Sequence, residues 1–228
     1  MVRSAGWTLT EYNNQNSPST FYSVGSEDCR LTTSPVTPTN LILNYKFTGS
    51  ATDATGTNNG TLQNAPTLTA DRFGIAASAY TFNGSSQYVS TSNSYTNPGN
   101  LSMSIWFKTA TTSGGLLMGF GSSQTGASAN YDRNLYMNNA GQLYFGINPG
   151  PIATINSASS YNDNNWHLAT ATLSTTTGLI LYVDGVQVAI NAGATTPQNF
   201  SGYCYTGCCC TTTGDSISNC ITAGSTGS

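Results

Sequence analysis

The chain is poor in charged residues. Lysine, arginine, aspartate and glutamate make up 7% of its 228 residues, against roughly 25% in an average globular domain. The net charge is −3, and the six basic residues are scattered along the chain: Arg3, Arg30, Lys46, Arg72, Lys108 and Arg133. No basic stripe can follow a phosphate backbone, so we expect no nucleic-acid partner.

Long hydrophobic runs are also lacking. No apolar stretch reaches the roughly 18 residues that a membrane-spanning helix requires, so we do not expect the chain to span a membrane. Serine, threonine, asparagine and glycine take the place of the missing charges, as on many secreted and cell-surface proteins. The composition therefore favours an extracellular or cell-surface location. The aromatic content of 11% argues for a folded domain and against disorder.

Helical periodicity is missing from every window, whereas short β-rich runs recur between Gly, Asn and Ser clusters. Many short strands separated by turn signals predict an all-β sandwich or barrel. The strongest local signal is Asp184-Gly185 between two such runs, because a type I′ hairpin turn needs positive φ at both central residues. A second hairpin is predicted over residues 137–143. The predicted strands are 41–47, 79–83, 87–91, 102–108, 116–120, 134–137, 143–147, 167–173, 179–183 and 186–190.

Composition divides the chain into three parts. Residues 1–40 are polar and interrupted by prolines, which predicts an N-terminal extended segment and linker with two short candidate strands, 6–10 and 21–24. Residues 41–195 hold the regular β pattern and are predicted to form the sandwich. Residues 196–228 are predicted to be a cysteine-rich tail.

Four stretches carry a family resemblance. They include Asp71-Arg72-Phe73-Gly74 with the following run to Ser85, and Trp166-His167-Leu168-Ala169 with the later Tyr182-Val183-Asp184-Gly185; the other two are residues 43–53 and 101–108. In this order and spacing, residues 41–190 resemble laminin-G-like members of the concanavalin A-like lectin/glucanase superfamily, in their bacterial form. The resemblance implies a two-sheet antiparallel jelly-roll sandwich that binds glycans or proteins.

The C-terminal part departs from this family pattern. Members usually end in a strand of the form Phe-x-Gly-x-Ile-Asp-Asp-x-x-Ile-Tyr, whereas here Asn199–Tyr203 is followed by the cysteine-rich tail. A jelly roll without this strand exposes an unpaired edge. The runs at 6–10 and 21–24 could cover it in cis, or a neighbouring molecule could do so by strand addition. A truncated or shifted reading frame is the alternative explanation.

Catalytic signals are absent from the sandwich region. Glycoside hydrolysis normally uses two carboxylates that face each other across the scissile bond, and both glutamates, Glu11 and Glu27, lie outside residues 41–195. The aspartates inside this region are too far apart in sequence to share one strand face. The single histidine, His167, has no nucleophile elbow nearby and is interpreted as structural. We therefore expect no enzymatic activity.

Two clusters of loop residues have the side chains that sugar binding uses. Aromatic faces stack on pyranose rings, and amide or carboxylate groups bind the hydroxyls. Trp106 and Trp166 are expected in the core, so the candidate ligand-binding residues are Tyr131, Asp132, Arg133, Asn134, Tyr161, Asn162 and Asp163, with Asn164 beside them. The alternative is that these are ordinary solvated loops.

A calcium ion is a further candidate ligand, because Ca²⁺ binds several oxygen atoms, carboxylates among them. Asp53 and Asp71 lie near Gly- and Asn-rich backbone and are the candidate metal ligands; as alternatives, both are turn residues or pair with Arg72 or Lys46.

The six cysteines form an even set, which suits disulfides in an exported chain. Zinc binding through thiolates is the alternative, although the spacing matches no known finger and no histidine assists. The candidate disulfide residues are Cys29, Cys204, Cys208, Cys209, Cys210 and Cys220.

Taken together, the composition, the family resemblance and the lack of catalytic signals predict a non-catalytic carbohydrate-binding or adhesion module with a glycan or cell-surface protein as partner. The alternative function is a structural subunit of a cell-surface fibre, assembled by strand addition or disulfides.

Overall fold

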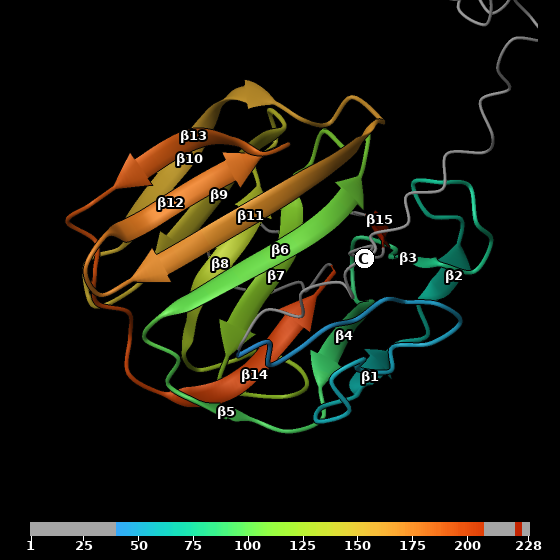
Figure 1. The fold of residues 1–228 in the computed structure, drawn as a ribbon, viewed down its shortest axis with the longest axis horizontal. Coiled ribbons are helices and arrows are strands. Elements are labelled where there is room, and N and C mark those ends of the chain that lie inside the picture. Colours follow the sequence, from blue (N-terminus) through green and yellow to red (C-terminus); the bar gives the residue numbers. More distant parts are fainter. Residues whose placement is uncertain (1–39, 208–221, 225–228) are drawn as a thin grey trace, which may run out of the picture. The chain divides into compact units, whose positions relative to one another are not determined.

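The computed structural model describes residues 40–207 and 222–224 (Figure 1). The candidate strands at 6–10 and 21–24 lie outside these residues, as do five of the six cysteines: Cys29, Cys208, Cys209, Cys210 and Cys220. The described part contains fifteen strands and no helix, which confirms the all-β prediction. No helix in this part is therefore long and apolar enough to cross a membrane.

The strands form two antiparallel layers, which we call sheet I and sheet II. Sheet I has the order β1-β4-β14-β7-β8-β9-β10, with β5 paired to β14. Its strands are β1 (Gly60–Gln63), β4 (Tyr88–Thr91), β5 (Tyr95–Thr96), β7 (Gly115–Gly121), β8 (Tyr131–Met137), β9 (Gln142–Ile147), β10 (Ala153–Ser160) and β14 (Ser201–Thr206).

Sheet II has the order β13-β12-β11-β6-β15-β3-β2, and its β6, β11 and β12 cross in front of β7, β8 and β9 in Figure 1. Its strands are β2 (Thr67–Thr69), β3 (Ala79–Thr81), β6 (Leu101–Lys108), β11 (Trp166–Ser174), β12 (Gly178–Val183), β13 (Val186–Asn191) and β15 (Thr222–Gly224). Two antiparallel sheets joined in this order form the two-sheet jelly-roll sandwich that was predicted.

The core lies between the sheets because apolar side chains alternate along the strands. On β6, Ile105 and Phe107 are buried and face the interior, where they join a single hydrophobic cluster. Leu135 and Phe145 of sheet I enter the same cluster. Nine of the ten predicted strands therefore appear where the alternation placed them, with ends that differ by at most three residues.

Both predicted hairpins are confirmed. Asp184 and Gly185 connect β12 to β13 with φ values of 51° and 79°, so both central residues have the positive φ that a type I′ turn requires. Strands β8 and β9 pair from Met137↔Leu143 onward, and the Asn138 side chain accepts hydrogen bonds from the backbone N–H groups of Ala140 and Gln142.

The predicted first strand, 41–47, does not form. Only an isolated bridge between Tyr45 and Asp53 remains, because φ is 54° at Phe47 and the chain turns away from an extended path. The segment contributes to packing instead, since the Phe47 ring is buried and stacks against Tyr45 at 5.7 Å between ring centroids.

The expectation of a missing closing strand is wrong. Strand β14, which falls in the region predicted as tail, lies between β4 and β7 in sheet I. Tyr205 explains why: its ring is buried against Tyr88, and its hydroxyl bonds Ser128 Oγ at 3.1 Å. Strand β15 likewise lies between β3 and β6 in sheet II. The sandwich therefore extends past residue 195 into the predicted tail.

Candidate functional site

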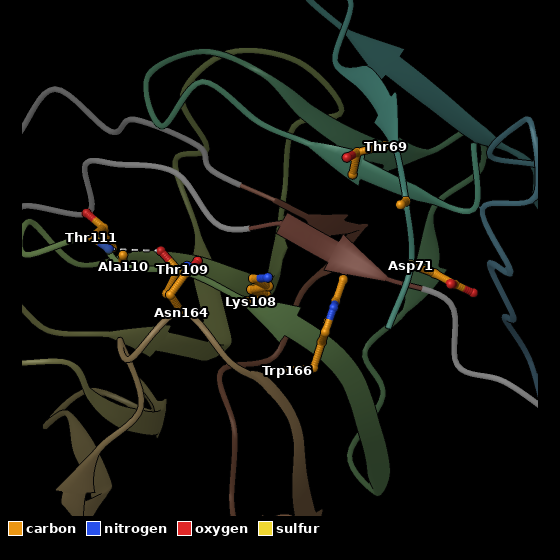
Figure 2. Close-up of a pocket in the computed structure, with 9 residues that line it drawn as sticks. Thr69, Asp71, Lys108, Thr109, Ala110, Thr111, Asn164 and Trp166 are labelled. Carbon is orange, nitrogen blue, oxygen red and sulfur yellow. Dashed lines mark hydrogen bonds between the residues drawn. The ribbon is translucent and has the colours of Figure 1, made fainter. Parts of the chain in front are cut away.

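An open groove of about 540 Å³ lies on the outer face of sheet II. One wall comes from the ends of β6 and β11 and the other from the segment that follows β2; β15 and β3 lie between these strands in the sheet. The lining residues are Thr69, Ala70, Asp71, Lys108, Thr109, Ala110, Thr111, Asn164 and Trp166 (Figure 2).

Strand alternation places Lys108 and Trp166 in this groove. Because Ile105 and Phe107 face the core, Trp106 and Lys108 face outward. Trp166 on β11 is the register partner of Lys108, so both side chains project from the same face, and Figure 2 shows them side by side. The expectation that Trp106 and Trp166 are core residues is therefore wrong: both are half-buried on the outer face.

Hydrogen bonds hold the polar rim of the first wall. The Asn164 N–H donates to the Thr109 carbonyl at 2.9 Å, and Asn162 Nδ2 donates to the Thr111 carbonyl at 2.8 Å. The Thr111 N–H donates to Thr109 Oγ1 at 3.1 Å. The β10–β11 loop and the end of β6 are thereby fixed to each other, which defines the positions of the threonine and asparagine side chains.

The second wall folds over the outer face through Asp71 and Arg72. Asp71 Oδ1 accepts hydrogen bonds from the N–H groups of Phe73 and Ile75, both at 2.9 Å. The Arg72 guanidinium lies 4.2 Å from the ring centroid of Phe73 and 4.5 Å from that of Trp106. Both distances are within the range of cation–π attraction, so Arg72 fastens this segment to sheet II.

The candidate residues Tyr161, Asn162 and Asp163 lie beside the groove and support it. Tyr161 packs edge-on against His167, with 5.0 Å between ring centroids, and Asn162 holds Thr111. Asp163 Oδ1 lies 3.1 Å from His167 Nε2. The neighbouring Asn164 lines the groove itself.

His167 is held between two carboxylates. Its Nδ1 lies 2.7 Å from Asp184 Oδ2, opposite the contact of Nε2 with Asp163. Burial alone would lower the pKa of His167, but hydrogen bonds to Asp184 and Asp163 and the charge of both carboxylates raise it above its ordinary value. Hydrogen bonds that Asp163 accepts from Asn165 and from His167, with the charge of His167, lower the pKa of Asp163 to about 2.

The other predicted cluster, residues 131–134, lies on β8 and not in a loop as expected, at the opposite end of the sandwich. Tyr131 is the register partner of Gly121 at the far end of β7, whereas Trp166 lies at the Lys108 end of β6 (Figure 1). Tyr131 is 45% exposed, and Asn134 fills the space that Gly119 leaves free. The structure therefore does not bring the two predicted clusters into one site.

Asp132 and Arg133 are buried and already hold protein partners. Arg133 donates from Nε to the Pro98 carbonyl at 2.9 Å, and from Nη2 to Asn97 Oδ1 at 2.7 Å and the Gln198 carbonyl at 3.1 Å. Asp132 accepts from the N–H groups of Arg133, Asn148 and Gln198. We therefore assign this pair a structural role in joining three loops, in place of the predicted contact with a ligand.

Both candidate calcium ligands accept hydrogen bonds from backbone N–H groups. The Asp53 carboxylate accepts hydrogen bonds from the N–H groups of Asn44, Thr55, Thr57 and Asn58. Burial opposes its ionisation, but these bonds and the Thr55 hydroxyl lower the pKa of Asp53 to about 2. Both carboxylate oxygens of Asp53 accept hydrogen bonds from N–H groups, and so does Asp71 Oδ1. Within residues 40–207 and 222–224, no three His, Cys, Asp or Glu side chains gather as a metal site.

Cys204 is the one candidate disulfide residue in the described part, and it has no disulfide partner there. It lies on β14 opposite Phe120. Burial raises the pKa of Cys204 to about 12, against the opposing charge of Arg133. The thiol is therefore protonated at neutral pH and weakly nucleophilic.

A two-layer antiparallel sandwich with an open aromatic and polar groove defines a lectin-like domain. The family model described as the concanavalin A-like lectin/glucanases superfamily matches residues 83–208, more than half of the chain. The chain belongs to this superfamily, as its motifs predicted. No curated protein matches it in sequence.

Solved structures of low sequence identity share the fold. The binding domain of botulinum neurotoxin DC, in complex with rat synaptotagmin II, has a TM-score of 0.56 at 16% identity, over 80% of this chain and 45% of that one. A structure of botulinum neurotoxin type C, whose cell entry depends on interaction with two ganglioside molecules, gives the same values. The chain thus spans slightly less than half of these toxin structures.

A third similar structure is matched over most of its own length. It is domain 4 of AbnA, an extracellular GH43 arabinanase from Geobacillus stearothermophilus, in complex with arabinotriose. The TM-score is 0.56 at 14% identity, over 80% of this chain and 91% of that one. These likenesses establish the fold of the sandwich.

Proposed function

We propose that this domain is an extracellular carbohydrate-binding or adhesion module without catalytic activity, and that a saccharide binds in the groove. The observation that carries the proposal is the Trp166 indole, half-buried in an open groove beside Lys108 and Asn164. A sugar ring presents apolar C–H groups on its face and hydroxyls at its edge. Trp166 offers a surface for the first, and the surrounding amide, ammonium and threonine hydroxyl groups offer partners for the second.

The similar structures support this proposal at the level of the fold. One of these proteins enters cells through interaction with gangliosides, another is in complex with arabinotriose, and the third is in complex with rat synaptotagmin II. A sandwich of this kind thus serves glycan and protein recognition elsewhere, which is the range of partners that we propose here.

The carboxylates around the groove argue against hydrolysis. A glycosidase normally places two carboxyl groups across the scissile bond, roughly 5 to 10 Å apart. Among the described residues, Asp71 is the one carboxylate that lines the groove, and its Oδ1 accepts hydrogen bonds from two backbone N–H groups. The alternative function, a fibre subunit assembled by strand addition, rested mainly on a missing closing strand. Strand β14 occupies that position in sheet I, so this support is lost.

The test is a glycan array followed by titration calorimetry of the bound saccharides, on the wild type and on two matched variants. Trp166→Ala removes the proposed stacking surface and is expected to weaken binding by about five- to tenfold, since stacking on an aromatic face contributes roughly 1 to 1.4 kcal/mol. Tyr131→Ala removes an exposed aromatic at the opposite end and is expected to leave binding unchanged. Loss of binding in the second variant alone would place the site elsewhere.

A further inference from the structure

The groove contains a cation that has no partner among the described residues. Lys108 ends β6 at the groove, and its ammonium forms no hydrogen bond or ion pair within residues 40–207 and 222–224. The remaining described cations are differently placed. Arg133 is buried in its own network, Arg72 stacks on Phe73 and Trp106, and Lys46 lies on the surface outside the groove.

The carboxylate that shares the groove does not neutralise Lys108. Asp71 directs Oδ1 to the N–H groups of Phe73 and Ile75, and its side chain points away from Lys108 in Figure 2. The ion pairs of the described part involve Asp132, Asp163 and Asp184, and none of these lines the groove. A local positive charge therefore remains in a chain whose net charge is −3.

We propose that the groove selects acidic saccharides, that is, sugars that carry a carboxylate. This inference rests on the proposed function and names its ligand class. The ring stacks on Trp166, and the carboxylate pairs with the Lys108 ammonium, which extends from the neighbouring strand on the same face. The hydroxyls are left to Asn164 and the threonines of the rim. Because the whole chain is negative, long-range attraction cannot supply this preference; it has to come from the contact with Lys108.

The test compares each acidic oligosaccharide with its own methyl ester, which keeps the ring and removes the charge. Suitable pairs are galacturonides, glucuronides and sialyl oligosaccharides, titrated calorimetrically into the whole chain. A charge-assisted contact in a half-open groove corresponds to roughly a five- to tenfold difference in affinity. We expect the acid to bind more tightly than the ester by that factor, and the factor to shrink as salt is raised from about 50 to 300 mM.

Two lysine variants separate the local contact from the net charge. Lys108→Met is expected to bind acid and ester equally, at the affinity that the wild type shows for the ester. Lys46→Met removes the same charge outside the groove and is expected to keep the preference. If the wild type binds the esters as tightly as the acids, or binds neutral sugars alone, the inference is overturned while the proposed function stands. If no saccharide in the panel or on the array binds, both are overturned.

Discussion

The contact of His167 with two carboxylates makes the stability of the domain depend on pH. Neutral imidazole can donate from only one of its nitrogens, whereas the imidazolium donates from both. Nδ1 and Nε2 each lie within hydrogen-bonding distance of a carboxylate, Asp184 at 2.7 Å and Asp163 at 3.1 Å. Only the protonated ring satisfies both contacts, which join the start of β11 to the β12–β13 turn and to the loop that holds Asn164.

The sign of the pH effect follows from the pKa. The folded pKa of His167 is raised above its ordinary value of 6.5, against the effect of burial, by its bonds to Asp184 and Asp163 and by their charges. A raised pKa means that the folded state binds the proton more tightly than the unfolded state does. The stabilisation is therefore complete below about pH 6.5 and is lost as pH rises through the folded pKa. Tyr161, which also faces the ring, is uncharged over this interval.

The variant Asp184→Asn isolates this effect. Asparagine keeps the acceptor for the Leu168 N–H, which Asp184 Oδ1 binds at 2.8 Å, and it suits a type I′ turn as well as aspartate does. The charge alone is lost. A hydrogen bond to a charged group contributes roughly 1.5–3 kcal/mol, but the Asp184 side chain is 46% exposed, so we discount the loss for solvent screening to about 1 kcal/mol at pH 6. That corresponds to about 2–4 °C in Tm for a chain of this size.

The assay is thermal unfolding of the wild type, Asp184→Asn and His167→Gln between pH 5.5 and 9.5. We expect the difference between the wild type and Asp184→Asn to be largest near pH 6 and to vanish at the alkaline end, and His167→Gln to lack this pH-dependent component. An equal destabilisation by Asp184→Asn at pH 6 and pH 9.5 would contradict this prediction, because the loss would then not depend on the imidazolium.

Two further predictions concern the interior. Arg133→Met should lower the free energy of unfolding by about 3 kcal/mol or more, because it leaves the buried Asp132 carboxylate without its cation; urea denaturation checks this, with Lys46→Met as the surface control, and an equal effect of both would contradict it. Cys204, with its pKa raised to about 12 by burial, should resist iodoacetamide at pH 8 in the folded chain and react once it is unfolded. Peptide mass spectrometry distinguishes Cys204 from the other cysteines, and rapid labelling of Cys204 in the folded chain would contradict the raised pKa.

Local rules sufficed to predict much of the sandwich from the sequence. The alternation of Ile105 and Phe107 with outward-facing neighbours on β6, and the Asp184-Gly185 turn, each depend on residues adjacent in the chain. The failures involve long-range contacts. Strand β14 follows from Tyr205 packing on Tyr88, more than a hundred residues away, and the segment 41–47 loses its strand because Phe47 turns into the core.

The site was predicted only in part for a similar reason. Asp132 and Arg133 were predicted to bind a ligand from their residue types alone. Their side chains are buried by loops at residues 97–98 and 198, and no local sequence pattern connects these loops to them. The groove itself could have been found: the alternation that places Phe107 inside also places Lys108 outside, and the superfamily motif at Trp166 pairs with it. The expectation that large aromatics are buried concealed this signal.

The most direct test of the central claim is a saccharide titration followed by ¹H–¹⁵N NMR, using the tightest ligand from the array. We expect the largest shifts on the Trp166 indole N–H and on the backbone of residues 69–71, 108–111 and 164, which line the groove. Shifts concentrated at residues 131–134, with the groove signals unmoved, would contradict this expectation.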